Sequence, residues 1–506
     1  MKRCGAAVAW FLCACQGAPA QRVPALCLPT DEPSEAYVRD ELRDALALHQ
    51  REVFDRNFDA HDPGELREHV AFSQPAIDAK QLGVADFFRA GDDMFGYLFR
   101  PENGLGNGLR GFAAAGPNGA PNLRRVAEAE FGGPEAMACA DCHSVGGDDG
   151  AGSLTQGVMQ RGDGERTSTG DLRSAPALLG VGPVQRLAQE MTQELTARRA
   201  DAVERVRAGG VAVTVALTAK GLAFGELTVG FDGRVDASKV TGVATDLVVR
   251  PFGWKGHQAS LRGMVREAFR LHLGMVSTLA QQRLATGQLT AESYGDGGWS
   301  DIDGDTISTE VDDGMASTMT AYLAQLEVPV MVPPQPTLLR DAFARGRTVF
   351  AALGCAHCHV PSIMLHDSVL TTAPEMSVGG KAITIDVARD GLAPKIAATT
   401  AGYVVELFSD LRRHHMGPQL ASPRAQPAVG GAIAADVWLT RPLWGLADSA
   451  PYLHDGRAAT VTAAILVHGG EADGARAAFV AAPLADRQAL AVFLLSLGRT
   501  PHVVVP

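Results

Sequence analysis

Residues 353–359, LGCAHCH, contain the pattern Cys-x-x-Cys-His, here called the second motif. This pattern attaches a c-type haem: both thiols form thioethers to the haem, and the histidine becomes the proximal iron ligand. A first motif, CADCH, occupies residues 139–143. The two motifs predict two covalently bound haem c groups per chain. The predicted haem-binding residues are Cys139, Cys142, His143, Cys355, Cys358 and His359, with both histidines bound to iron.

Two other uses of paired cysteines fit the pattern less well. A four-cysteine zinc site usually spaces its pairs about 15–20 residues apart, whereas these pairs lie in different halves of the chain. A redox-active dithiol does not require a histidine directly after its second cysteine. Haem attachment is therefore the preferred interpretation.

Length and composition are those of a globular protein with two or three domains. The chain has 506 residues, of which 46% are hydrophobic and 20% charged. Its net charge of −12 argues against nucleic acid as a partner. The same charge would suit docking of a small basic protein that donates or accepts electrons.

The N-terminus predicts export. Residues 1–20 resemble a signal peptide, with Lys2 and Arg3 before a short apolar stretch. Residues 12–15, LCAC, resemble a bacterial lipobox, which would leave Cys15 lipidated and the protein anchored to a membrane. The alternative is cleavage after Ala20, which would give a soluble periplasmic protein. Both routes lead to the periplasmic side of a bacterial envelope.

The pattern of apolar residues predicts a mainly α fold built from two cytochrome c-like domains. We expect a helical N-terminal extension over 21–104 and a first haem domain over 105–326. A proline-rich linker over 327–336 and a second haem domain over 337–506 would follow. Alternating apolar residues near 211–231 predict a small β-hairpin inserted in the first domain.

An acidic stretch is a candidate calcium site. Asp301, Asp303 and Asp305 offer the clustered oxygen ligands that calcium prefers. A solvated acidic loop explains the same residues equally well.

Several segments carry a resemblance to a known family. They are FSDLRRHHMG (408–417), RPLWGL (441–446), APYLHDGRA (450–458) and VHGGEA (467–472). With the two motifs, they resemble the di-haem oxidoreductases, also called thiol oxidoreductases, of the bacterial di-haem cytochrome c peroxidase superfamily. The resemblance spans roughly residues 105–500. It implies electron transfer between an external protein, the second haem and a reactive first haem, with peroxide or oxygen as the small substrate.

The resemblance also implies iron ligands. In the peroxidases the sixth ligand of the C-terminal haem lies fourteen residues after the histidine of a Tyr-x-His-x-Gly segment. Here that histidine is His454, and counting fourteen residues from it gives His468. A helix-capping role is the alternative for His468, and Met416 is a rival ligand. At the position of the first haem domain that corresponds to His468, the chain has Ala268, which cannot bind iron. We therefore expect that iron to be open, or capped by His272.

Catalytic residues are harder to assign, because the chain departs from the family where peroxidases use a glutamine and a glutamate. At the matching positions this chain has Pro251 or Phe252 and, further on, Arg262. Candidates to handle protons instead are His257, Gln185 and Glu190. Two other functions remain open: a pure electron carrier with both irons six-coordinate, and an oxygenase like the rubber-cleaving enzymes of the same superfamily.

Overall fold

The computed structural model describes residues 72–105, 126–127, 136–147, 149–152, 158–160, 170–286, 310–331, 333–334, 337–377 and 379–499. The predicted signal peptide with Cys15, and the candidate calcium ligands Asp301, Asp303 and Asp305, lie outside these residues. None of the described helices is both long enough and apolar enough to cross a bilayer.

The prediction of a mainly α fold is wrong, because the described chain mixes helices with short strands. These strands form six separate sheets of two or three strands each within the described ranges. Most of the unpredicted strands lie between the second motif and the C-terminal helices. They are β8 (Ile363–Leu365), β9 (Val369–Thr372), β10 (Ile383–Asp386), β11 (Ala397–Thr399), β12 (Gly402–Val405), β13 (Arg413–His415) and β14 (Val437–Leu439). Runs this short give almost no alternating pattern in the sequence.

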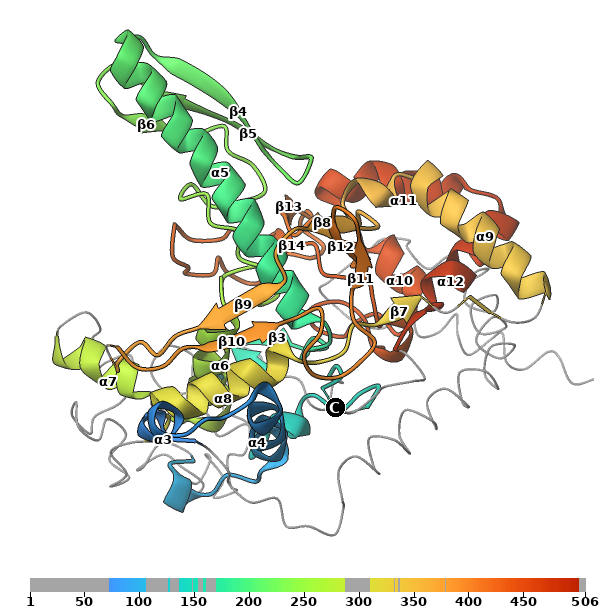
Figure 1. Ribbon diagram of the computed structural model, residues 1–506. Helices are drawn as coiled ribbons and strands as arrows, with labels where there is room; N and C mark the ends of the chain where they lie inside the picture. The colour runs from blue at the N-terminus through green and yellow to red at the C-terminus, as the bar shows by residue number, and fades with distance from the viewer. Residues whose placement is uncertain are drawn as a thin grey trace, which may run out of the picture.

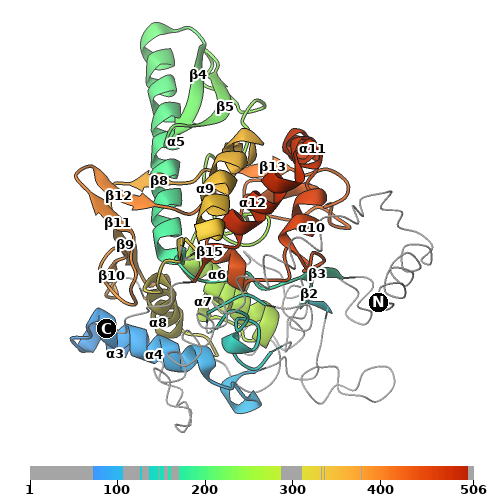
Figure 2. The same ribbon diagram turned by 90° about the vertical axis from the view of Figure 1, so that its right-hand side faces the viewer.

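Two helices of the predicted N-terminal extension pack within the first half of the protein. Helices α3 (Gln74–Ala79) and α4 (Val84–Gly96) both contact α8 (Asp313–Ala324), and all three lie together in Figures 1 and 2. Gly91 permits the close approach, since a Cβ there would overlap the Cβ of Tyr322. Ile77 and Phe87 thereby join the larger of two hydrophobic cores.

A long helix and a hairpin form an arm that projects from the body (Figure 1). Helix α5 (Val181–Gly209) is buried at its N-terminal end, and β4 (Val213–Ala219) pairs antiparallel with β5 (Leu222–Val229) along its outer part. Strand β6 (Val235–Asp236) extends this sheet. Leu217 and Phe224 are fully buried. The pairing lies where the alternating apolar residues predict a hairpin.

The first half contains several further elements. They are the 3₁₀ turns η1 (Pro101–Asn103) and η3 (Cys139–Asp141), the strands β1 (Val126–Ala127), β2 (Val158–Gln160) and β3 (Asp171–Arg173), and the helices α6 (Leu261–Ala268) and α7 (Thr278–Ala285). One turn of π-helix, η6 (Phe269–Leu273), continues α6 and carries His272. Such π-turns often occur at functional sites.

The second half is built on two crossing helices. Helix α9 (Thr337–Ala352) leads into the second motif at η8 (Cys355–His357) and packs on α12 (Leu484–Leu494). Phe350, Phe408 and Phe493 meet in the second hydrophobic core. The other elements here are η9 (Leu446–Asp448), α10 (Val461–Leu466), η10 (Gly470–Ala472) and α11 (Asp473–Ala481).

The proline-rich segment predicted as a linker takes part in the fold. Within it, β7 (Val330–Met331) pairs with β15 (Leu497–Gly498) near the end of the described chain. Glu327 is fully buried and forms an ion pair with Arg499. This segment therefore holds the C-terminal end against the first half of the protein.

Candidate haem-binding site

The second motif places two histidine rings opposite each other. His359 follows η8, and His468 lies just after α10; their ring centroids are 6.5 Å apart. The Nδ1 of His359 bonds to the carbonyl of Phe408 at 3.1 Å, and the Nδ1 of His468 bonds to the carbonyl of Ala464 at 2.7 Å. A carbonyl accepts only, so each Nδ1 must donate, which leaves each Nε2 with a lone pair for a metal.

The spacing of these rings fits one metal ion between them. Metal–imidazole bonds are about 2.0–2.1 Å long, so two rings sharing an axial metal would have centroids roughly 6–6.5 Å apart. Burial lowers the pKa of His359 to about 4 and also lowers the pKa of His468, so both rings are in the neutral, ligating form at pH 7. The residues present therefore fit an iron with two axial imidazoles.

A cavity of about 640 Å³ surrounds this pair of rings. Cys355 and Cys358 line it together with both histidines, as haem attachment requires. Met416, the rival ligand, also lines the cavity. His468 is nevertheless the residue whose ring faces His359.

The first motif is built in a similar way on η3. The Nδ1 of His143 bonds to the carbonyl of Gly150 at 3.1 Å, and Phe95 packs near the ring. The pKa of His143 is lowered to about 4, mainly by burial and in part by the neighbouring His272. The structure thus brings His272 within electrostatic reach of the first motif, as its proposed capping role would need.

The cysteines do not have the character of a reactive dithiol. Burial raises the pKa of Cys139 to about 12 and that of Cys355 to about 11. Redox-active and zinc-binding cysteines instead have thiolates favoured by nearby positive charge or metal. The thiols of Cys139 and Cys355 are therefore better suited to covalent attachment than to exchange chemistry.

Three rings that pack together, Trp254, Trp438 and His454, form what we call the aromatic wall, a packing that the sequence does not predict. The rings of Trp438 and His454 stack at 3.9 Å, and Trp254 meets His454 edge-on at 6.4 Å. All three line the cavity of the second motif. Burial lowers the pKa of His454 to about 3, so this ring stays uncharged.

The aromatic wall connects directly to the first motif through one short segment. Trp254 Nε1 donates to the carbonyl of Ser174 at 2.7 Å, and the backbone N–H of Ser174 donates to the carbonyl of His454 at 2.8 Å. Two residues further on, Pro176 lies close enough for its backbone to influence the pKa of His143. Only the tertiary structure brings these segments together, so no pattern along the chain predicts their contact.

The three candidate proton-handling residues lie in separate places, and none of them lines the cavity. Gln185 Oε1 accepts the backbone N–H of Leu261, and Glu190 pairs with Lys220. His257 Nε2 bonds to Glu267 at 2.7 Å. The structure therefore does not bring these three side chains together.

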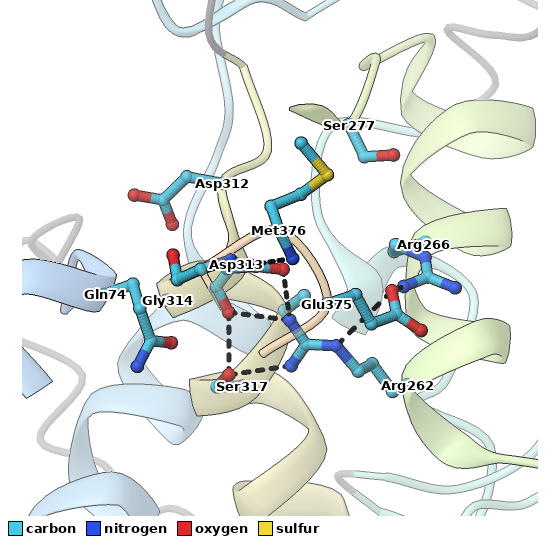
Figure 3. Close-up of polar contacts among 12 residues, drawn as sticks. Gln74, Arg262, Arg266, Ser277, Asp312, Asp313, Gly314, Ser317, Glu375 and Met376 are labelled. Atoms are coloured by element: carbon cyan, nitrogen blue, oxygen red, sulfur yellow. Dashed lines mark hydrogen bonds and ion pairs between the residues drawn. The ribbon is translucent and has the colours of Figure 1, made fainter. Parts of the chain in front are cut away.

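Arg262 stands where the peroxidases have a proton-handling side chain, and it is held in a buried polar cluster (Figure 3). Its guanidinium contacts Asp313 at 2.6 Å and donates to Ser317 Oγ at 2.7 Å. Glu375 approaches from the β9–β10 loop and also pairs with Arg266. These contacts fix Arg262 as a link between α6, α8 and that loop.

A comparison with known protein families identifies the family of this chain. The model of a family described as "Di-haem oxidoreductase, putative peroxidase" matches residues 233–497, more than half of the chain. No curated protein matches the chain. The matched region contains the second motif, the aromatic wall and His468. The chain belongs to the di-haem oxidoreductase family.

Proposed function

We propose that this protein is an exported di-haem c-type cytochrome that works as a peroxidase-like oxidoreductase. The family supplies the reaction class and the haem cofactors. Two complete attachment motifs support covalent binding of both haems. When bound, haem iron supplies one-electron chemistry and, where an axial position is open, binding of peroxide or oxygen.

The observation that carries the proposal is the pair of facing imidazoles at the second motif. Cys355 and Cys358 would hold the macrocycle, and His359 and His468 would close both axial positions, their Nε2 atoms aimed by the carbonyls behind them. An iron closed in this way has no site for peroxide or oxygen. The second haem would therefore store electrons and pass them on.

The first motif would hold the reactive haem through Cys139, Cys142 and His143. Gly150 orients His143 through its carbonyl and makes the imidazole a stronger donor to iron. His272 lies close enough to affect His143 and would serve as a displaceable cap. If His272 instead stays bound permanently, the protein would be a pure electron carrier, which is the second candidate function.

The chain's own residues would provide the path between the haems. Trp254, Trp438 and His454 line the second cavity, and Trp254 and His454 both hydrogen-bond to Ser174. Burial lowers the pKa of His454 to about 3, so this ring itself carries no charge at physiological pH. Electrons would thus cross packed aromatic rings rather than water.

Arg441 is suited to bind a haem propionate. It lines the cavity and lies 5.6 Å from the ring of Trp254, and burial lowers its pKa to about 10, so it remains charged at pH 7. Guanidinium groups bind carboxylates through paired hydrogen bonds. We therefore expect Arg441 to neutralise one propionate of the second haem.

The test is to remove one axial ligand. His468→Gly should convert the second haem from low-spin to high-spin and let it bind carbon monoxide. The control is His415→Gln, which changes an exposed histidine of β13. If His468→Gly leaves both haem spectra as in the wild type, His468 is not a ligand and the division of roles fails.

The same spectra separate the two candidate functions. A high-spin or ligand-binding first haem in the resting or half-reduced wild type supports the oxidoreductase. Two purely low-spin haems that bind neither carbon monoxide nor peroxide would support the electron carrier instead.

Export and lipid anchoring form a separate part of the proposal. Labelling with a fatty acid should mark the wild type and not Cys15→Ala. A mature N-terminus at Gln21 would show that the protein is released rather than anchored.

A further inference from the structure

Lys255 is the most completely buried cation beside the aromatic wall. Its side chain is 0% exposed, and it directly follows Trp254 in a tight turn between two glycines with positive φ, Gly253 and Gly256. The side chain leaves the first half of the protein and enters a loop of the second half, just before β14. No interpretation of the sequence assigned it a role.

The ammonium group meets a complete set of acceptors. Its Nζ donates to the carbonyls of Ala434 at 3.0 Å, Ala435 at 2.7 Å and Val437 at 2.9 Å. A lysine ammonium has three protons to donate and no lone pair, whereas a neutral amine has only two protons. Three carbonyls, none of which can donate, therefore match the charged form.

The same ammonium contacts the aromatic wall. Nζ lies 3.8 Å from the centroid of the Trp438 ring, a favourable cation–π contact. His454 stacks on the same indole, with ring centroids 3.9 Å apart. Lysine, tryptophan and histidine thus form one contiguous stack beside the haem cavity.

Backbone contacts join the same two segments around Lys255. The N–H of Leu439 donates to the carbonyl of Trp254 at 3.1 Å, and Arg413 donates to the carbonyl of Gly256. Asp436, in the acceptor loop, lies near enough for Lys255 to lower its pKa, although a hydrogen bond from His415 has the larger effect. The carboxylate of Asp436 therefore pairs with His415, and the direct partners of the Lys255 ammonium are the three carbonyls.

We propose that Lys255 is a positioning residue whose ammonium acts as a built-in cation, fixing the Trp438–His454 stack and raising the reduction potential of the second haem. The effect on the haem rests on the proposed function. Reduction adds an electron, and a nearby fixed positive charge in a protein interior favours the reduced form. For one buried unit charge we expect an effect on the order of tenfold in the reduction equilibrium.

The main test replaces the ammonium by a neutral group of similar length. Lys255→Met should lower the potential of the second haem by on the order of tenfold in equilibrium constant, or about 59 mV for one electron. It should also change the near-ultraviolet circular dichroism of the tryptophans. The control is Lys239→Met, which removes an exposed lysine paired with Glu226 and should change neither signal.

Chemical rescue distinguishes a cation from simple packing. Lys255→Ala leaves three carbonyls around a vacated site, so added ammonium or methylammonium chloride should restore both the circular dichroism and the potential. Sodium chloride at the same ionic strength serves as the comparison. Lys255→Arg, which keeps the charge, should keep most of the potential.

The outcomes separate the two proposals. A wild-type potential and wild-type circular dichroism in Lys255→Met, or a loss in Lys255→Arg as large as in Lys255→Met, would overturn the role of Lys255. If Lys255→Met does not fold, Lys255→Ala is prepared with ammonium and the ammonium is then dialysed away. A circular dichroism spectrum and a potential that do not change on dialysis would also overturn the role of Lys255. Fewer than two haems per chain would refute the proposed function, while circular dichroism and rescue would still test the cation.

Discussion

The buried ion pair between Arg499 and Glu327 should be among the most sensitive points of the fold. The Nε of Arg499 lies 2.6 Å from Glu327 Oε1, and the two residues are 2% and 0% exposed. Arg499 also donates through Nη1 to the carbonyl of Gly146, three residues after the first motif, and through its backbone N–H to Asp448. One side chain thereby joins the first motif, the proline-rich segment and the C-terminal end.

Arg499→Met should therefore destabilise the protein strongly. Removing one partner of a buried pair leaves the other charge uncompensated, which typically costs about 3–5 kcal/mol. The Glu327→Gln, Arg499→Met double variant should recover part of this loss, because it leaves no buried charge behind. The expected coupling between the two sites is about 1–3 kcal/mol.

Urea unfolding followed by far-ultraviolet circular dichroism would measure both effects. Arg345→Met is the control, because Arg345 pairs with Asp486 at the same 2.6 Å distance but is 54% exposed, so its loss should cost at most about 1 kcal/mol. A loss below about 1 kcal/mol for Arg499→Met, or a double variant that is simply additive, would refute the reasoning.

Three further predictions concern the haems and the groups around them. Pyridine haemochrome analysis should find two c-type haems per wild-type chain, and Cys142→Ala or Cys358→Ala should each compromise one attachment; one haem in the mature wild type would contradict this. Although burial opposes it, the hydrogen bond to Asp410 raises the pKa of His414 to about 10. Because this value lies above 6.5, His414 should stabilise the fold fully below pH 6.5 and lose that effect as pH rises through about 10. His414→Gln should thus cost about 1–3 kcal/mol in urea unfolding at pH 6 and clearly less above pH 10; a cost independent of pH would count against it. Trp254→Phe should keep both haems but slow electron transfer between them, as measured by flash reduction; an unchanged rate would exclude Trp254 from the path.

The parts of the protein that could be predicted from sequence depend on neighbours along the chain. The two motifs are legible because attachment needs two cysteines and a histidine at fixed spacing. Helices α9 and α12 are legible in the sequence for a similar reason, since their apolar residues recur with the helical period. The short strands were missed, because strands such as β13 and β14 pair across more than twenty residues of loop and carry no pattern of their own.

The chemical role of a histidine here depends on what lies behind its ring, which sequence does not reveal. His468 has a carbonyl on Nδ1, so its Nε2 keeps a lone pair for iron. His414 belongs to the same cavity wall, but its Nε2 bonds to Asp410 and its Nδ1 to Glu471. Two carboxylates hold that imidazole protonated, and a protonated imidazole has no lone pair to offer a metal. His414 is therefore excluded as an iron ligand by its partners, while His468, which lines the same cavity, is prepared for that role.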